Sequence, residues 1–305
     1  MSRMNKLALA AATAITVVGA AGAAHAEKIK IGITQNNVGV DSYQTTYEKA
    51  FIAAAAKNPD VETVVLDAGG DVARQIGQMQ DLIQQKVDVI IIWPTDGKAV
   101  VPVVRKAHQA GIPVVVTNSN IAADGMDFIA AFSGPNNIQQ GASAAELMCE
   151  ALGNKGEIVQ ISGQPGYTTA IERQKGFEDQ LANSCPDVKI LETHVMEAFL
   201  VKYNKIDGVY SGDDNMGVGA LNAAKAANRA KDIKFVGATN FAVGYEAMER
   251  GEYYGSIYQS PVDDAEAALA TAIAVKAGKQ VPKLNYFETP KITKANMDKF
   301  TKPVF

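Results

Sequence analysis

The feature that most limits how this chain can fold is a regular alternation of short strands and helices. Residues 28–34, 61–66 and 87–93 are β-branched or apolar runs, and helical patterns at residues 41–58 and 72–86 separate them. The run at 87–93 is almost continuously apolar, as expected for a strand that helices cover on both faces. Strands and helices that alternate at this spacing predict βαβ units around a parallel sheet.

The alternation continues through the first half of the chain and then begins again near residue 137. The further predicted elements are helix 99–110, strand 112–117, strand 128–132, helix 137–152, strand 157–161, helix 169–182, strand 188–192, helix 195–203, strand 208–211, helix 217–227, strand 234–237, helix 241–250, strand 254–259 and helix 263–277. Two successive sets of this kind predict two similar lobes, although a β/α barrel of eight units also has about this length.

Proline-containing segments indicate where the chain passes between the lobes. A Ser-Gly-Pro sequence at 133–135 interrupts the pattern near the middle, and Pro261 and Pro290 interrupt it later. We therefore expect an α/β fold of two doubly wound parallel-sheet lobes that are joined by a three-segment hinge. The expected N-terminal lobe is residues 27–132 plus 260–288, and the expected C-terminal lobe is residues 133–259 plus 289–305.

The first 26 residues have the pattern of a removable export signal. Arg3 and Lys6 precede an apolar stretch at residues 7–23, and small residues follow at Ala24 and Ala26. A basic start, an apolar middle and a small-residue cleavage site define a secretory signal. A transmembrane anchor is the alternative, but the stretch is only weakly apolar for a span that needs about 20 apolar residues. We expect cleavage after Ala26 and export of the rest as a soluble protein.

Charge and cysteine content exclude several classes of protein. The 305-residue chain has a formal charge of −4, and the loss of Arg3 and Lys6 with the signal takes it to −6. An acidic chain without a basic run is not expected to bind nucleic acid. Its two cysteines, Cys149 and Cys185, are too few for a disulfide scaffold or a four-ligand zinc site. After export they either form one disulfide or stay as two thiols, and the sequence leaves both open.

Motifs for catalysis and for cofactors are missing from the sequence. After the signal, the only histidines are His108 and His194, and neither lies in the pattern of a catalytic triad or a metal site. The chain has neither the Gly-x-x-x-x-Gly-Lys-Ser/Thr phosphate loop nor the Gly-x-Gly-x-x-Gly dinucleotide motif. We expect no enzymatic activity, no bound metal and no cofactor.

Six short motifs occur in the order that is typical of one known protein family. They are IGIT at 31–34 with the asparagines of 36–37 after it, IWPTD at 92–96, GIPVV at 111–115, IERQKGF at 171–177, GDDNM at 212–216 and IYQSP at 257–261. Together, and with an export signal in front, they resemble the periplasmic sugar-binding proteins of ABC importers, of the ribose/galactose type. The resemblance extends from about residue 28 to residue 290.

This resemblance implies a protein that closes two lobes around a small molecule. It implies a periplasmic location, a sugar or polyol as ligand, and a membrane permease and an ATPase as partners, with the binding protein itself a monomer. Two alternatives remain open. The same fold serves as a sugar sensor in chemotaxis or signalling, and an exported α/β enzyme is the alternative from another class.

Polar and aromatic residues stand at the carboxyl ends of the predicted strands, which is where open parallel sheets bind ligands. The candidates are Asn36, Asn37, Tyr43, Trp93, Asn118, Arg173, Asp213, Thr239 and Gln259, of which Tyr43 and Arg173 lie on the helices that follow their strands. By resemblance, Asn37, Asn118, Arg173, Asp213 and Gln259 match ligand-contacting positions of the family. Amides, carboxylates and guanidinium groups pair with the hydroxyls of a sugar, and aromatic rings pack on its C–H faces.

Each candidate also has an ordinary structural interpretation. The asparagines suit turns, and Gln259 suits a hydrogen bond within the hinge. Arg173 suits an exposed helix position, where it pairs with Glu172 or Asp179.

Three further residues also have both a structural and a ligand-binding interpretation. Trp93 lies at a strand end before a proline and suits simple packing. Either Asp213 or Asp214 suits the N-cap of the following helix. We expect one of these aspartates to cap the helix and the other to bind.

The chain departs from the ribose-type pattern at several loops. Residues 118–119 are Asn-Ser where the family has an Asp-Arg pair, residues 239–240 are Thr-Asn where it has an aspartate, and residues 38–40 replace an aromatic pair. Hydrogen bonds to charged groups are the stronger ones, so we expect a ligand other than ribose, such as a linear polyol or another sugar. Only His194 stands between Thr193 and Val195, where the family has a longer loop, and we predict that this short connection weakens or alters binding.

Overall fold

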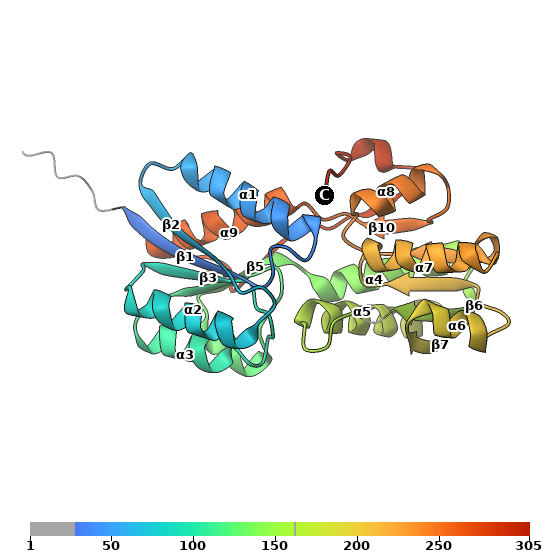
Figure 1. Cartoon of the computed structure of the whole chain (residues 1–305), viewed down its shortest axis with the longest axis horizontal. Helices are drawn as coiled ribbons and strands as arrows, with labels where there is room; N and C mark the ends of the chain where they lie inside the picture. The colour runs from blue at the N-terminus through green and yellow to red at the C-terminus, as the bar shows by residue number, and fades with distance from the viewer. Residues whose placement is uncertain (1–27, 162) are drawn as a thin grey trace, which may run out of the picture.

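The computed structural model describes residues 28–161 and 163–305, and these residues form two lobes that lie side by side (Figure 1). Each lobe has one six-stranded sheet with helices on both faces. The predicted export signal, residues 1–26, lies outside the described residues. Within the described ranges, every helix is too short or too polar to be a membrane span.

The first lobe contains a parallel sheet with the strand order β11-β5-β4-β3-β1-β2. Its elements are β1 (Ile29–Gln35), α1 (Ser42–Ala56), β2 (Val61–Asp67), α2 (Val72–Gln84), β3 (Val89–Ile92), α3 (Val101–Gln109), β4 (Val114–Thr117), η1 (Ala123–Phe128), β5 (Ala131–Pro135), α9 (Pro261–Lys276) and β11 (Leu284–Phe287). Successive side chains of β3 enter opposite cores. Ile91 packs in the core with α1 and α9, and Ile90 and Ile92 pack in the core with α2 and α3.

The second lobe repeats this arrangement with the strand order β12-β10-β9-β8-β6-β7, in which only β12 is antiparallel to its neighbour. Its elements are α4 (Asn137–Leu152), β6 (Lys155–Ile161), α5 (Thr168–Ser184), β7 (Asp187–His194), α6 (Met196–Lys202), β8 (Gly208–Ser211), α7 (Asp214–Ala226), η2 (Ala230–Asp232), β9 (Lys234–Val236), α8 (Ala242–Glu249), β10 (Gly255–Ile257), β12 (Lys291–Thr293) and η3 (Met297–Lys299). Helices α4 and α5 share one core with the sheet, and α6, α7 and α8 share the other.

The chain passes between the two sheets three times. It leaves the first sheet after β5, returns between β10 and α9, and leaves again between β11 and β12. The expected two-lobe α/β fold with a three-segment hinge is confirmed, and a single barrel is excluded.

Two sequence expectations differ from the structure at the first crossing. The strand expected at 128–132 is β5, at Ala131–Pro135, and η1 at Ala123–Phe128 precedes it. The Ser-Gly-Pro sequence therefore belongs to the strand, and the chain crosses three residues later than the expected boundary at residue 132. Gly134 explains the difference, because a Cβ on it would lie only 2.8 Å from the backbone nitrogen of Asn118. In this strand the glycine provides close approach to β4 rather than a turn.

Two short strands were not expected from the sequence. They are β11 and β12, with four and three residues, and each lies at an edge of its sheet. Helices α7 and α9 also begin earlier than expected, at Asp214 and Pro261. Proline suits the first turn of a helix, because the backbone N–H that it lacks would have no acceptor within the helix at that position.

Candidate functional site

One cavity lies between the lobes, at the carboxyl ends of strands from both sheets, and has a volume of about 540 Å³. The loops after β1, β3 and β4 line one side, and the loops after β6, β8 and β9 line the other, with the β10–α9 crossing between them. All nine candidate residues line this cavity, namely Asn36, Asn37, Tyr43, Trp93, Asn118, Arg173, Asp213, Thr239 and Gln259. The structure therefore brings together every candidate that the strand-end pattern picked out.

Arg173 is the most extensively bonded side chain of the cavity. It is 5% exposed, and its Nε donates to Gln140 Oε1 at 2.8 Å. Its Nη1 donates to Gly212 O at 2.7 Å and to Thr239 Oγ1 at 3.0 Å. Its Nη2 donates to Gln259 Oε1 at 2.9 Å. The guanidinium thus joins four segments of the second lobe and its hinge through uncharged acceptors.

The alternative of an exposed arginine is therefore wrong. Asp179 forms its ion pair with Lys175, and Arg173 faces the cavity from the inner side of α5. Close packing of α4 against α5 places it there. A Cβ on Gly141 would lie 2.0 Å from Arg173 O, and a Cβ on Gly176 would lie 1.9 Å from Ile138 O. The two helices pack backbone against backbone at these glycines.

A chain of hydrogen bonds leads from Arg173 across the hinge into the first lobe. Gln259 Nε2 donates to the Tyr43 hydroxyl at 2.7 Å, and this hydroxyl donates to Asp264 Oδ2 at 3.0 Å. Asn118 Nδ2 donates to the same Asp264 oxygen at 2.6 Å. Gln259 is thus a hinge residue, as its structural interpretation expected, and it also lines the cavity.

The two neighbouring aspartates have different roles from those we expected. Asp213 caps α7 by accepting from Met216 N at 2.9 Å, and it also lines the cavity. Asp214 is buried in the protein interior, where it accepts from Ser256 Oγ and from Phe241 N at 3.0 Å. One aspartate therefore both caps the helix and faces the cavity, and the other does neither.

Trp93 packs and lines the cavity at the same time. It is 2% exposed, and its ring meets that of Tyr43 edge-on, with centroids 6.1 Å apart. Its Nε1 donates to the Tyr167 hydroxyl at 2.9 Å, and Thr169 N donates to Ser119 Oγ at 3.2 Å. Both hydrogen bonds join the first lobe to the second, so the lobes are closed on each other here.

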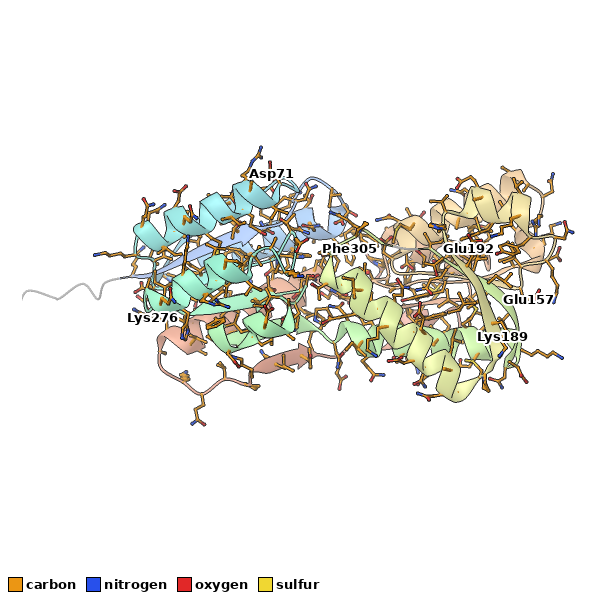
Figure 2. All side chains as sticks on the ribbon, turned by 90° about the horizontal axis from the view of Figure 1, so that it is seen from below. Asp71, Glu157, Lys189, Glu192, Lys276 and Phe305 are labelled. Atoms are coloured by element: carbon orange, nitrogen blue, oxygen red, sulfur yellow. A yellow bond between two sulfur atoms is a disulfide. The ribbon has the colours of Figure 1, made fainter. Side chains whose placement is uncertain are left out.

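Phe305 adds an aromatic contact where the lobes meet, and Figure 2 labels it between them. Its ring lies 5.6 Å from the Tyr43 ring of α1 and 6.0 Å from the ring of Phe241, which precedes α8. Phe305 O accepts from Ala242 N at 2.7 Å. These contacts hold the last residues against both lobes.

Several buried polar atoms of the cavity wall have no partner among the described residues. They are Thr95 Oγ1, Gln160 Oε1, Thr169 Oγ1 and the Tyr210 hydroxyl. Most buried polar atoms in proteins form hydrogen bonds. Unpaired hydroxyl and amide groups on both walls of one cavity are therefore suited to a ligand that both donates and accepts hydrogen bonds.

The short connection after β7 contributes nothing to this cavity. Val195 alone separates the end of β7 from the start of α6, and no residue of either element lines the cavity. The prediction that this connection changes binding stays a prediction.

Cys149 and Cys185 form a disulfide, with their Cα atoms 6.1 Å apart. It joins the end of α4 to the residue that ends α5. In the part of the chain that the structure describes, no three His, Cys, Asp or Glu side chains are grouped as metal ligands.

Asp264 makes folding stability depend on pH. Burial raises the pKa of Asp264 from its ordinary value of 3.8 to about 7, although hydrogen bonds from Asn118 and Tyr43 lower it. Between these two pH values the folded protein keeps a proton that the unfolded chain has lost. The contribution of this proton to the free energy of unfolding is therefore fully present below about pH 4 and is lost as the pH rises to about 7. The loss is about 4 kcal/mol, at 1.36 kcal/mol per pKa unit.

We expect the Asp264→Asn variant to remove this part of the pH dependence. The other carboxylates whose pKa burial raises, such as those of Asp213 and Asp214, contribute equally to both proteins. Urea denaturation at pH 5 and pH 8 should show the wild type losing about 3 kcal/mol more than the variant over this interval. Parallel pH profiles for the two proteins would contradict the assignment.

Comparisons with known proteins agree with this geometry. A family model described as "Periplasmic binding protein domain" matches residues 31–280. A xylitol-binding protein of Mycolicibacterium smegmatis is 31% identical, over 97% of this chain and 87% of that protein. A putative rhizopine-binding protein of Rhizobium meliloti is 30% identical, over 97% of this chain and 99% of that protein.

Solved structures show the same likeness. An ABC transporter solute binding protein from Bacillus halodurans with bound myo-inositol superposes with a TM-score of 0.82 at 26% identity, over 90% of this chain and 97% of that one. The fructose-binding periplasmic domain of a hybrid two-component system superposes with a TM-score of 0.82 at 26% identity, over 89% of this chain and 92% of that one.

Proposed function

This chain belongs to the periplasmic binding protein family, and we propose that it captures a sugar or polyol between its lobes and delivers it to an ABC importer. The observation that carries the proposal is the cavity between the sheets, where amide and hydroxyl groups of both lobes lie beside aromatic rings. A hydroxyl group both donates and accepts, so several hydroxyls on one molecule satisfy such a wall. The family and the cavity support binding without chemical change of the ligand.

The charges of the cavity disfavour an anionic ligand. Arg173 is the one cationic side chain among the described lining residues, and Asp41 and Asp213 line the same cavity. Burial raises the pKa of both aspartates, which favours their uncharged forms. The guanidinium already donates to four acceptors of the protein, so an anion finds no excess of positive charge in the cavity.

The volume of the cavity suits a monosaccharide or a short polyol. At about 30 Å³ for each water molecule, 540 Å³ is the volume of about 18 waters. This exceeds the number of carbon and oxygen atoms in one hexose, so one such ligand fits together with several waters.

Among these ligands, we propose a polyol as the first candidate. Asn118 and Thr239 stand where ribose-type proteins have aspartates, so the wall has fewer charged acceptors for a sugar ring. The relative from Mycolicibacterium smegmatis is named for xylitol, and the structure from Bacillus halodurans holds myo-inositol. Both are polyols without a ring oxygen or an anomeric hydroxyl.

Delivery to a permease requires export, which the sequence of residues 1–26 supports. We propose that cleavage follows Ala26, that the protein acts in the periplasm as a monomer, and that a permease and an ATPase receive its ligand. The two-component fructose-binding domain supports a second role, in which the closed lobes are recognised by a receptor. Loss of uptake on deletion of the gene supports the first role, and loss of a signalling response with uptake intact supports the second.

The proposal predicts a change in Trp93 fluorescence on binding. Trp93 is the only tryptophan of the chain and lies in the cavity wall with a hydrogen bond to Tyr167 of the other lobe. We expect one of xylitol, ribitol, myo-inositol, D-ribose or D-allose to change its emission and to raise the melting temperature, as RT ln(1 + [L]/Kd) requires. Citrate serves as an anionic control. If no carbohydrate changes emission, melting temperature or compactness in small-angle scattering, the proposal is wrong.

A further inference from the structure

A buried carboxylate lies directly behind the cavity wall, in a place that no strand-end pattern indicated. Asp264 belongs to the first turn of α9 and is 0% exposed. It does not line the cavity, but it accepts hydrogen bonds from Asn118 and Tyr43, which both do. The inference below rests on the proposed function and concerns how this second layer selects the ligand.

The surroundings of Asp264 give it no partner of opposite charge. Its helix packs in an apolar core that includes Ala265, Ala268 and Leu269. Within the described residues no salt bridge includes Asp264, and its Oδ1 has no hydrogen-bond partner. Burying a carboxyl group in this way is costly, and departures from ordinary packing tend to occur at functional sites.

The bond to Asp264 determines which end of the Asn118 amide is available to a ligand. An amide has one end that only donates and one that only accepts. Because Asn118 Nδ2 donates to Asp264 at 2.6 Å, its Oδ1 is the free end. This oxygen accepts no hydrogen bond from any other described residue, and Asn118 lines the cavity. The charge of a carboxylate on the amide nitrogen also polarises the amide and strengthens its oxygen as an acceptor.

The same carboxyl oxygen determines the direction of the Tyr43 hydroxyl. A tyrosine has one hydroxyl proton, and Tyr43 gives it to Asp264 while it accepts from Gln259 Nε2. Gln259 Oε1 in turn accepts from Arg173 Nη2 and from Gln140 Nε2. No proton of Tyr43 is left for a ligand, so Asn118 and Tyr43 together offer acceptor oxygens on this part of the wall.

We propose that Asp264 is a positioning residue for ligand selection, which turns Asn118 and Tyr43 so that the first-lobe wall accepts hydrogen bonds and selects a ligand whose hydroxyl donates there. Asp264 takes no direct part in contact with the ligand. Its effect on binding is transmitted through the orientation of these two side chains.

The first test replaces the carboxylate and measures Kd for xylitol and myo-inositol by calorimetry. Asp264→Leu removes the acceptor and should weaken binding at least tenfold. The Asn118 amide and the Tyr43 hydroxyl then turn toward other hydrogen-bond acceptors. Asp264→Asn keeps an oxygen for both donors and should stay within about threefold of the wild type. Asp263→Asn is the matched control, since Asp263 is exposed in the same helical turn, and it should leave Kd unchanged.

The second test exchanges the two groups and stays informative if Asp264→Leu does not fold. Asn118→Asp sets a second carboxyl group at hydrogen-bond distance from Asp264, where two like charges repel, and should weaken binding at least tenfold at pH 8. Adding Asp264→Asn in the same chain restores a donor between the two positions and should recover at least about threefold. If Asp264 had a purely structural role, the losses of binding free energy from the two substitutions would add, and the double variant would show no rescue.

The outcomes separate this inference from the proposed function. A wild type that binds no carbohydrate overturns both. A wild type that binds, together with an Asp264→Leu variant of equal affinity, overturns this inference alone. Additive effects of Asn118→Asp and Asp264→Asn on Kd also overturn this inference, and a recovery of affinity in the double variant supports it.

Discussion

Replacing Arg173 with alanine is expected to weaken ligand binding by at least tenfold, which corresponds to about 1.4 kcal/mol or more. The side chain lines the cavity, and its four hydrogen bonds hold Gln140, Gly212, Thr239 and Gln259 in place. Truncation removes a donor to the ligand and leaves buried acceptors without partners, each of which costs about 1–3 kcal/mol. We expect the free energy of unfolding to fall by about 3 kcal/mol as well.

Calorimetry with the ligand identified by Trp93 fluorescence measures the first effect, and urea denaturation measures the second. Lys175→Ala is the matched control, because Lys175 is on the same helix but is exposed and forms an ion pair with Asp179. Arg173→Lys should restore little, since lysine lacks the planar fork that reaches several acceptors at once. An Arg173→Ala variant that folds and binds like the wild type would show that the ligand lies elsewhere.

Removal of the disulfide is expected to lower the free energy of unfolding by about 4 kcal/mol. Cys149 and Cys185 are 36 positions apart in the sequence, and closing a loop of this length restricts the unfolded chain by about that amount. The double substitution Cys149→Ala and Cys185→Ala, or reduction of the wild type, should shift the urea midpoint accordingly. Two reactive thiols on denatured, unreduced protein would contradict the disulfide.

The disulfide should matter much less for binding than for stability. It joins the far ends of α4 and α5, whereas Gln140 and Arg173 lie nearer the cavity. The close contacts at Gly141 and Gly176 keep the helices together between these points. The reduced protein, where it remains folded, should therefore bind with an affinity within about threefold of the oxidised protein.

The strand-end residues of the site could be found from the sequence because a parallel sheet places them together. Each buried strand is an apolar run, and the polar residue after it falls at the same edge as its neighbours. This rule led to Asn118 after β4 and to Asp213 after β8, and both line the cavity. It needs only local sequence and the order of strands in each half.

Residues that contact the site from behind its wall could not be found in this way. Gln140 is on α4 and Asp264 on α9, and each contacts the site from a second layer. Asp263 and Asp264 are adjacent acids in the first turn of α9, so both suit an ordinary helix start. Only the packing of α9 on the first sheet buries one and leaves the other exposed.

The sequence alone therefore determined the two-lobe α/β architecture. The spacing of apolar residues indicates whether a segment is a helix or a strand and which of its faces is buried, whatever element it packs against. The tertiary structure alone decided which way Asn118, Tyr43 and Gln259 present their donors and acceptors. Those directions depend on contacts between distant parts of the chain, such as the bond between residues 118 and 264, which are 146 positions apart. A pattern of neighbouring residues carries no information about a partner at that distance, so hydrogen-bond direction in the cavity emerges only when the lobes are assembled.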